Sequence, residues 1–410
     1  MTSIPHPLCF SVIPESSVNG KRIKDEAVRI LHLGGAYALT WINNAQRAAG
    51  HLMKSTSTFL LASVLAFAPA PFHPLFAADN SLNAIADAYR VKLGESAGDL
   101  PYFVAKYHGP TPHSALIVLH GHPRDAGKTL AAALKAAQLA AKTDDRLLVA
   151  PLFPVSDAQA AHCHSPGVPP AQADDALWSC SSWIEGDLDN QGNTSSFAAL
   201  DSLVGELKIK WPTVRSVTIA GFSAGAQFVQ HYVGFAHPPA GVKLRYVIAD
   251  PGSWLYFDSR RPQPVKNDRP ADWRDCNQQG GCSFDWVENR NDLCPNVDRW
   301  KYGIEAVPAF LDQNSTSVRQ RYASADITYL EGEKDTGSSP GTFYKILDKS
   351  CAAQAQGPYR LQRGIAYAAY DRRFIAPHAK RDLLIVPDCA HDVACVFPST
   401  TGRSALFDAP

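Results

Sequence analysis

Methionine is scarce in this chain of 410 residues and occurs only as Met1 and Met53. Net charge is lacking as well, because 39 basic residues balance 39 acidic ones. No block of basic residues is present to grip a phosphate backbone, which argues against a nucleic-acid partner. Internal repeats and low-complexity tracts are also missing, so a repeat architecture is excluded.

The second methionine is predicted to be the true start of the protein. Met53 and Lys54 form a short basic start, and residues 59–68 (FLLASVLAFA) have the length of a signal-peptide core. An apolar stretch this short cannot span a bilayer as a helix. We therefore expect residues 1–52 to be an upstream extension, or otherwise part of an unusually long leader, and residues 53–78 to be a signal peptide. Residues 79–410 would then form a secreted, extracellular or periplasmic domain without a transmembrane segment.

Eight cysteines follow the predicted signal peptide. An even number of cysteines in an exported chain indicates disulfides. Short sequence separation favours Cys389 with Cys395, Cys163 with Cys180, and a pairing within a group of three. That group is Cys276, Cys282 and Cys294, and Cys351 is the eighth cysteine.

Strand-like and helix-like segments alternate along the rest of the chain. Strands are expected at 102–107, 115–119, 147–151, 244–249, 327–331 and 383–386, with one more around Val217 and Ile219, and helices at 129–142, 195–211, 224–235, 343–354 and 362–370. This order predicts an α/β fold, in which helices cover both faces of a mostly parallel central sheet.

Two stretches, 156–193 and 251–317, break this alternation and are rich in Trp, Pro, Gly, Asn and Cys. We interpret them as disulfide-stabilised insertions that form a cap or the walls of a substrate cleft. Their aromatic residues are candidates for those walls, and packing inside the protein is the alternative. The candidates are Trp178, Trp183, Trp254 and Tyr256.

The segment SVTIAGFSAG, residues 216–225, places a Gly-x-Ser-x-Gly motif between a strand and a helix. Ser223 would therefore sit on a sharp turn that raises its hydroxyl above the sheet. Gly221 and Gly225 are required there because a Cβ atom would collide with the neighbouring strand or helix. The turn also ends at a helix N-terminus, which favours developing negative charge. The pattern predicts a nucleophilic serine.

A general base and an acid can be assigned from chain order. His391 follows the last expected strand and is bracketed by two cysteines, which distinguishes it from His378 and His231. Asp335 follows the preceding expected strand and is the preferred acid. Asp250 is the second choice. Glu331 and Glu333 are rivals on the same loop as Asp335.

Two backbone N–H groups are expected to form an oxyanion hole. The first is that of Ala224, directly after the nucleophile, and the second belongs to the turn after strand 115–119. His122 is preferred there, with Gly121 as the alternative.

No cofactor or metal is predicted for this chain. The segment from Gly121 to Thr129 resembles a phosphate-binding loop, but the spacing of its glycines is wrong. The triplet of His162, Cys163 and His164 lacks a further ligand set at recognisable spacing, and so does the pair of His120 and His122.

Together these segments resemble the α/β-hydrolase superfamily and, more narrowly, a group of secreted microbial α/β-hydrolases of unassigned substrate. The resemblance rests on GFSAGAQFVQHY (221–232), WKYGI (300–304), YLEGEKDTG (329–337), LDKSCAAQAQG (347–357), RGIAY (363–367) and AHDVACVF (390–397). It implies that Ser223, Asp335 and His391 form a catalytic triad. Asp250 departs from the asparagine that such relatives tend to carry.

The leading hypothesis is a serine hydrolase that cleaves a small-molecule or polymeric carboxylic ester through an acyl-enzyme. A peptidase or amidase using the same triad is one alternative. The other is a non-catalytic binding protein on a hydrolase scaffold, since a fold alone does not guarantee chemistry.

Overall fold

The computed structural model describes residues 82–106, 111–277, 281–288 and 294–408. The predicted extension at 1–52 and the signal peptide at 53–78 lie outside these residues. The chain divides into two units, Met1–Pro74 and Leu75–Pro410.

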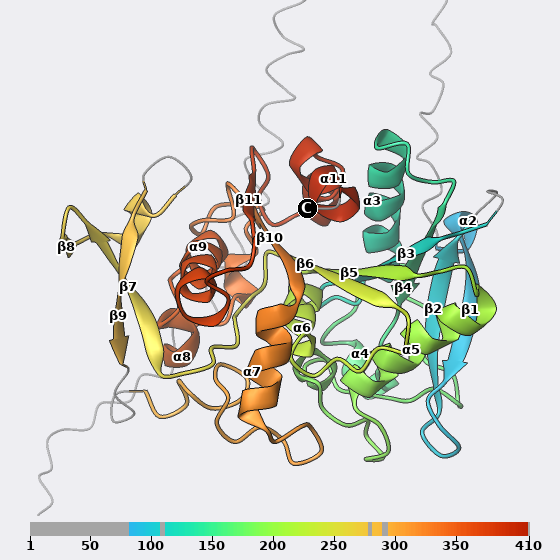
Figure 1. The fold of residues 1–410 in the computed structure, drawn as a ribbon. Helices are drawn as coiled ribbons and strands as arrows, with labels where there is room; N and C mark the ends of the chain where they lie inside the picture. The colour runs from blue at the N-terminus through green and yellow to red at the C-terminus, as the bar shows by residue number, and fades with distance from the viewer. Residues whose placement is uncertain (1–81, 107–110, 278–280, 289–293, 409–410) are drawn as a thin grey trace, which may run out of the picture. The chain divides into compact units, whose positions relative to one another are not determined.

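An eight-stranded sheet forms the centre of the second unit (Figure 1). β1 is antiparallel to β2, β2 is antiparallel to β4, and all other neighbouring strands are parallel. The predicted mostly parallel sheet is therefore confirmed. In spatial order the strands are β1 (Ala86–Lys92), β2 (Asp99–Ala105), β4 (Arg146–Pro151), β3 (Ser114–Leu119), β5 (Ser216–Phe222), β6 (Lys243–Ala249), β10 (Asp326–Gly332) and β11 (Leu383–Val386).

Helices cover both faces of the sheet. Successive side chains of a strand point to opposite faces, and both faces carry apolar residues that pack against helices. In β3, Ile117 and Leu119 pack with residues of α5 (Ser196–Lys210) and α6 (Ala224–Tyr232). Leu116 and Val118 belong to a second apolar cluster, which includes α3 (Ala126–Leu139) and α11 (Thr400–Phe407). Figure 1 shows α3 and α11 on one side of the sheet and α5 and α6 on the other.

The two predicted insertions hold short elements and a small second sheet. Residues 156–193 contain α4 (Asp157–Ala160) and η1 (Ser182–Glu185). Residues 251–317 contain a three-stranded sheet in which β7 (Arg260–Lys266) lies between β8 (Arg269–Pro270) and β9 (Ser283–Glu288). In the chain, η2 (Trp273–Asp275) connects β8 to β9, and the start of α7 (Ser315–Ser324) follows β9. The remaining elements are α2 (Leu82–Ile85), η3 (Tyr344–Ile346), α8 (Cys351–Gln354), α9 (Arg360–Tyr370), η4 (Asp371–Ile375) and α10 (Val393–Val396).

The aromatic residues predicted as cleft walls lie in the core instead. Trp178, Trp183, Trp254 and Tyr256 are each 0% exposed. Trp183 stacks on Phe153 with ring centroids 5.2 Å apart, and Trp254 stacks in the same way on a tyrosine of α9. The cleft-wall prediction is wrong because these insertions bury their large side chains in the core of the main sheet rather than in a core of their own.

Four disulfides link the eight cysteines: Cys163–Cys180, Cys276–Cys282, Cys294–Cys351 and Cys389–Cys395. The pairs preferred for short separation agree with the structure, but the grouping of Cys294 with Cys276 and Cys282 was wrong. Cys294 meets a cysteine 57 residues later, beside Val297 and Ala352 in a small buried cluster. Sequence separation alone cannot reveal a contact made by tertiary folding.

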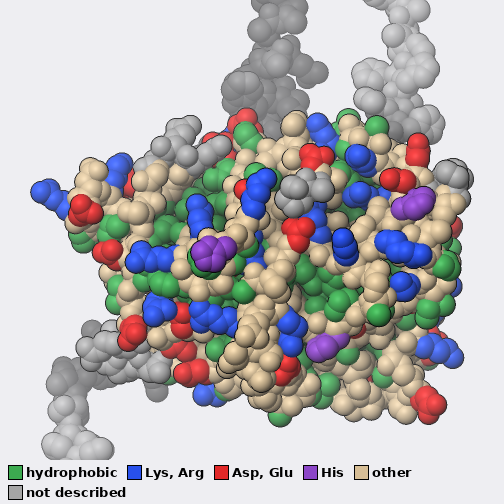
Figure 2. Space-filling view, in the orientation of Figure 1, with side chains coloured by type: hydrophobic (Ala, Val, Ile, Leu, Met, Phe, Trp, Pro, Cys, Tyr) green, Lys and Arg blue, Asp and Glu red, His purple; other side chains and the backbone are tan. Residues whose placement is uncertain are grey.

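Acidic and basic side chains are interspersed over the face seen in Figure 2. None of the helices in the described part of the chain is both long and apolar enough to cross a bilayer.

Candidate active site

Ser223 lies on the sharp turn between β5 and α6. Its φ of 59° and ψ of −120° are strained for a residue with a side chain. The turn is held by hydrogen bonds of the Ser223 N–H to the oxygen of Ala249 and of the Gln227 N–H to the oxygen of Ser223, both of 3.0 Å. A Cβ at Gly225 would lie 2.5 Å from the oxygen of Leu119, and one at Gly221 would overlap the carbonyl of Gly225. Both glycines are therefore required by close backbone approach.

His391 faces this serine from the loop after β11. Its Nε2 lies 2.8 Å from the Oγ of Ser223, so the hydroxyl can donate its proton to the imidazole. The ring packs against Phe222, with centroids 4.8 Å apart, and its backbone N–H donates to the oxygen of Gly341. The Cys389–Cys395 disulfide closes the loop around it. The disulfide and the backbone hydrogen bond therefore fix the loop that carries His391, and the contact with Phe222 orients its ring.

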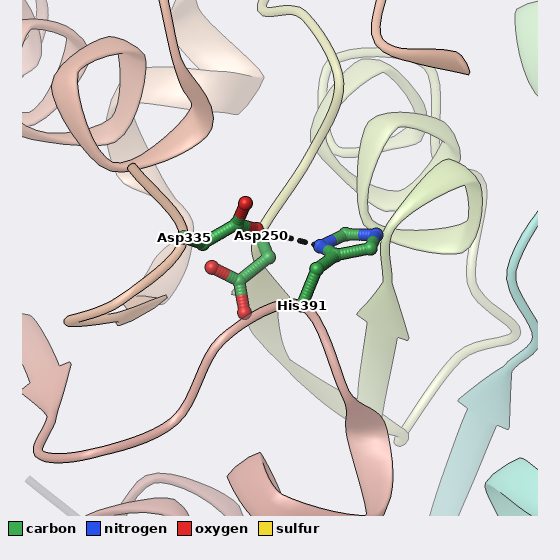
Figure 3. A group of neighbouring side chains, drawn as sticks. All are labelled: Asp250, Asp335 and His391. Atoms are coloured by element: carbon green, nitrogen blue, oxygen red, sulfur yellow. Dashed lines mark hydrogen bonds and ion pairs between the residues drawn. The ribbon is translucent and has the colours of Figure 1, made fainter. Parts of the chain in front are cut away.

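Asp335, on the loop after β10, accepts a hydrogen bond from the other side of the imidazole. The Nδ1 of His391 and the Oδ2 of Asp335 are 2.7 Å apart (Figure 3). The Nη1 of Arg360, at the start of α9, lies 3.3 Å from the Oδ1 of the same carboxylate. All three side chains are buried. The preferred acid of the sequence analysis therefore meets the preferred base.

The surroundings of His391 favour its neutral form. Burial lowers the pKa of the imidazole below its ordinary value of 6.5, and the positive charge of Arg360 lowers it further. The hydrogen bond to Asp335 acts in the opposite direction but does not outweigh them. A neutral imidazole with Nδ1–H bonded to a carboxylate leaves Nε2 free to accept a proton.

The turn after β3 lies beside the serine. A Cβ at Gly121 would be 3.6 Å from the Cβ of Ser223. The N–H of Gly121 already donates to Asp125 at 3.1 Å, whereas those of His122 and Ala224 have no hydrogen-bond partner among the residues that the structure describes. This favours His122 over Gly121 as the second oxyanion donor.

His120 shapes this turn, which the sequence analysis did not foresee. Its Nδ1 lies 2.9 Å from the oxygen of Gly121, and its Nε2 accepts from the N–H of Phe153 at 3.4 Å. Burial lowers the pKa of His120 to about 4, so the ring stays neutral and can hold both contacts. The His-Gly dipeptide was a signal for the turn, but not for the role of this side chain.

Side chains of the types that can bind a metal ion come together at one place among the described residues. Single ligand atoms of Asp250, Asp335 and His391 all lie within 4.8 Å of one another (Figure 3). A cation there would compete for the atoms that join His391 to Asp335. The other sequence candidates are committed elsewhere, since Cys163 is in a disulfide and His120 holds the turn.

Lys128, from the segment that resembles a phosphate loop, belongs to the first turn of α3. Its Nζ pairs with Asp392 at 2.8 Å, next to the catalytic histidine candidate. The pair links α3 to the loop after β11.

A groove with a cavity volume of about 1180 Å³ begins at the edge of this site. Phe343 lines it and contacts the ring of His391, with centroids 6.1 Å apart. Pro123, in the turn after β3, and Ala394, in the helix after His391, also line the groove. Much of its lining is apolar, including Leu82, Ile85, Ala131, Leu134, Val168 and Pro398.

No protein-family model and no curated protein matches the sequence. Solved structures do resemble the fold. A poly(3-hydroxybutyrate) depolymerase, LpqC from Bordetella parapertussis, is 19% identical with a TM-score of 0.50, over 79% of this chain and 90% of its own. Poly(aspartic acid) hydrolase-1 from Sphingomonas sp. KT-1 is also 19% identical, over 78% of this chain and 95% of its own, with a TM-score of 0.49. At such identity the likeness concerns the fold.

Proposed function

This chain has the α/β-hydrolase fold, and we propose that it is a serine hydrolase that cleaves carboxylic esters through an acyl-enzyme intermediate. The observation that carries the proposal is the continuous hydrogen-bonded line from Ser223 through His391 to Asp335. Such a line can deprotonate the serine while the carboxylate stabilises the imidazolium that forms.

In the proposed reaction Ser223 attacks the ester carbonyl while His391 takes its proton. The negative oxygen of the tetrahedral intermediate would accept hydrogen bonds from the N–H groups of Ala224 and His122. His391 then returns the proton to the departing alcohol, and a water activated by the same imidazole releases the acid. We favour esters over amides because ester hydrolysis is the commoner activity of this fold.

We infer that the protein acts outside the cytosol. Four disulfides favour an oxidising compartment, since thiols of cytosolic proteins are kept reduced. The signal peptide predicted at residues 53–78 would deliver the chain to such a compartment.

Labelling with a fluorophosphonate probe tests the proposal. The probe should modify the purified protein at Ser223 and leave Ser223→Ala unlabelled, because only an activated serine attacks it. Equal labelling of both proteins, or of neither, would contradict the proposed function. A parallel screen of p-nitrophenyl esters and peptides compares ester substrates with amide substrates. Cleavage of peptides without ester turnover would favour the amidase alternative.

The lowered pKa of His391 predicts how activity depends on pH. The base must be neutral, so kcat/KM for an ester should fall as the pH drops through the pKa of the imidazole, and this limb should lie below pH 6.5. Arg360→Gln should move the limb to higher pH, because it removes a positive charge that opposes protonation. A pH–rate profile of both proteins measures this. A limb at or above pH 6.5 in the unchanged protein would contradict the assignment.

The groove beside the site predicts a preference for esters with an extended apolar part. Ala131→Phe would place a ring in the groove and should lower kcat/KM for long-chain p-nitrophenyl esters by about tenfold or more, with little effect on the acetate. Leu139→Phe adds the same ring to an exposed position of α3 outside the groove lining and serves as the matched control. Equal losses on long and short esters would argue against this path.

A further inference from the structure

A buried group of carboxyl side chains lies behind the imidazole. Asp250 follows β6 with a φ of 52°, and Glu331 belongs to the neighbouring strand β10. Both are 0% exposed. With Asp335 they form a group of three acidic side chains, and two of these, Asp250 and Asp335, lie beside His391. The histidine requires only one.

The hydrogen bonds of this group are incomplete. The Oδ1 of Asp250 accepts from the N–H of Gly332 at 2.8 Å. The Oδ2 of Asp250 and both oxygens of Glu331 have no hydrogen-bond donor among the described residues. Buried carboxylate oxygens without donors are costly, and a retained proton removes the cost by turning one acid into a donor.

The fold makes room for the second of these acids. A Cβ at Gly364, on α9, would overlap the carboxyl group of Glu331. Any other residue at this position would displace the acid. The helix is therefore shaped to accommodate Glu331 beside Asp250.

Few charges compensate the group. Arg360 faces it from α9 and pairs with Asp335, and His391 faces it from the loop after β11. Lys128 of α3 acts on His391 from a distance and is paired with Asp392. Burial and the neighbouring acids raise the pKa of Asp250 to about 8 and that of Glu331 well above its ordinary value. Within the part of the chain that the structure describes, Arg360 is the cation that acts on these acids, and Asp335 is the acid it contacts.

We propose that Asp250, which is protonated beside Glu331, is a second positioning residue for His391. It loses its proton and accepts the Nδ1–H of the imidazole when Asp335 cannot. The inference rests on the proposed function and deepens it. Asp250 has the required position, because its carboxyl group, that of Asp335 and a nitrogen of His391 lie within 4.8 Å of one another. Loss of the Asp335 charge would make ionisation of Asp250 easier, because that charge adds to the burial that raises the pKa of Asp250.

The test compares four proteins: the unchanged chain, Asp250→Asn, Asp335→Asn and the double variant. Asp250→Asn retains an oxygen for the N–H of Gly332 and should change kcat by less than about fivefold. Asp335→Asn should lower kcat by about 10²-fold. This is less than the roughly 10⁴-fold loss expected when an asparagine leaves the histidine with no carboxylate. The double variant should show that full loss.

The pH profile supplies a readout that a merely structural role would not move. In Asp335→Asn both His391 and Asp250 must lose a proton, so kcat/KM should rise by about a hundredfold per pH unit on the acid side. The unchanged protein should rise about tenfold per unit. Should Asp250→Asn fail to fold, a tenfold rise in Asp335→Asn is enough to overturn the proposal. So is a loss in Asp335→Asn as large as in the double variant.

Titration of His391 by NMR separates this proposal from the proposed function, because it needs no substrate. The pKa of His391 should be higher in Asp335→Asn than in the double variant, since only the former keeps a carboxylate beside the imidazolium. Equal pKa values would refute the role of Asp250 even if the protein were not an esterase. An inactive unchanged protein with the expected titration difference would refute the esterase proposal alone.

Discussion

Replacing Ser223 by alanine is expected to lower kcat for ester hydrolysis by about 10⁶-fold, which is the loss found when the nucleophile of a serine hydrolase is removed. The reason is that no other group can form the acyl-enzyme at the end of β5. Steady-state assays with a p-nitrophenyl ester measure kcat for both proteins. Ser202→Ala, on the exposed side of α5, is the matched control and should leave kcat unchanged.

The loss should also be non-additive with that of His391→Ala. Serine and histidine act as one unit, because the imidazole has no proton to take once the hydroxyl is gone. The double variant should therefore be no slower than either single variant. A double variant that is slower by the product of both losses would mean that the two side chains work in separate steps.

Gly221→Ala and Gly225→Ala are each expected to lower the free energy of unfolding by more than about 4 kcal/mol. The new methyl group would meet backbone atoms rather than a movable side chain. These are the carbonyl of Gly225 in the first case and the oxygens of Leu119 and His120 in the second. Chemical denaturation followed by circular dichroism would measure the change, and insoluble protein would agree with it.

Gly205→Ala provides the control for these substitutions. Gly205 lies in α5, and a Cβ there would have no neighbour within 4 Å. Alanine is preferred to glycine inside a helix, so this variant should gain about 0.5–1 kcal/mol. If Gly221→Ala behaved like Gly205→Ala, the close packing described at the serine turn would be wrong.

Much of the fold could be predicted because its strands are short apolar runs between clear breaks. The strand of Ala115 to Leu119 and the last strand appear in the structure close to their expected bounds. β1 was missed because its polar residues hide its burial pattern. The helix expected at 343–354 is only the short turn η3 followed by α8. Its apolar residues Phe343 and Ile346 are exposed instead of forming a buried helical face.

The candidate site follows a different logic. Ser223, Asp335 and His391 could be proposed because each follows a recognisable strand and parallel strands end at one edge of a sheet. The positions of Arg360 beside Asp335 and of Glu331 against α9 could not be predicted, because a buried charged residue leaves no recognisable pattern in a single sequence. The burial of the tryptophans could not be predicted either, because the composition of an insertion does not say which way its large side chains point.

The hydrogen-bonded line of the site joins residues 168 positions apart. During synthesis at about 5–20 residues per second, the imidazole leaves the ribosome roughly 10 to 30 seconds after the hydroxyl that it serves. β11, which comes just before that imidazole in the chain, is an edge strand and the last strand of the sheet to be made. A nascent chain that ends before residue 391 therefore holds the serine hydroxyl without the imidazole that would activate it.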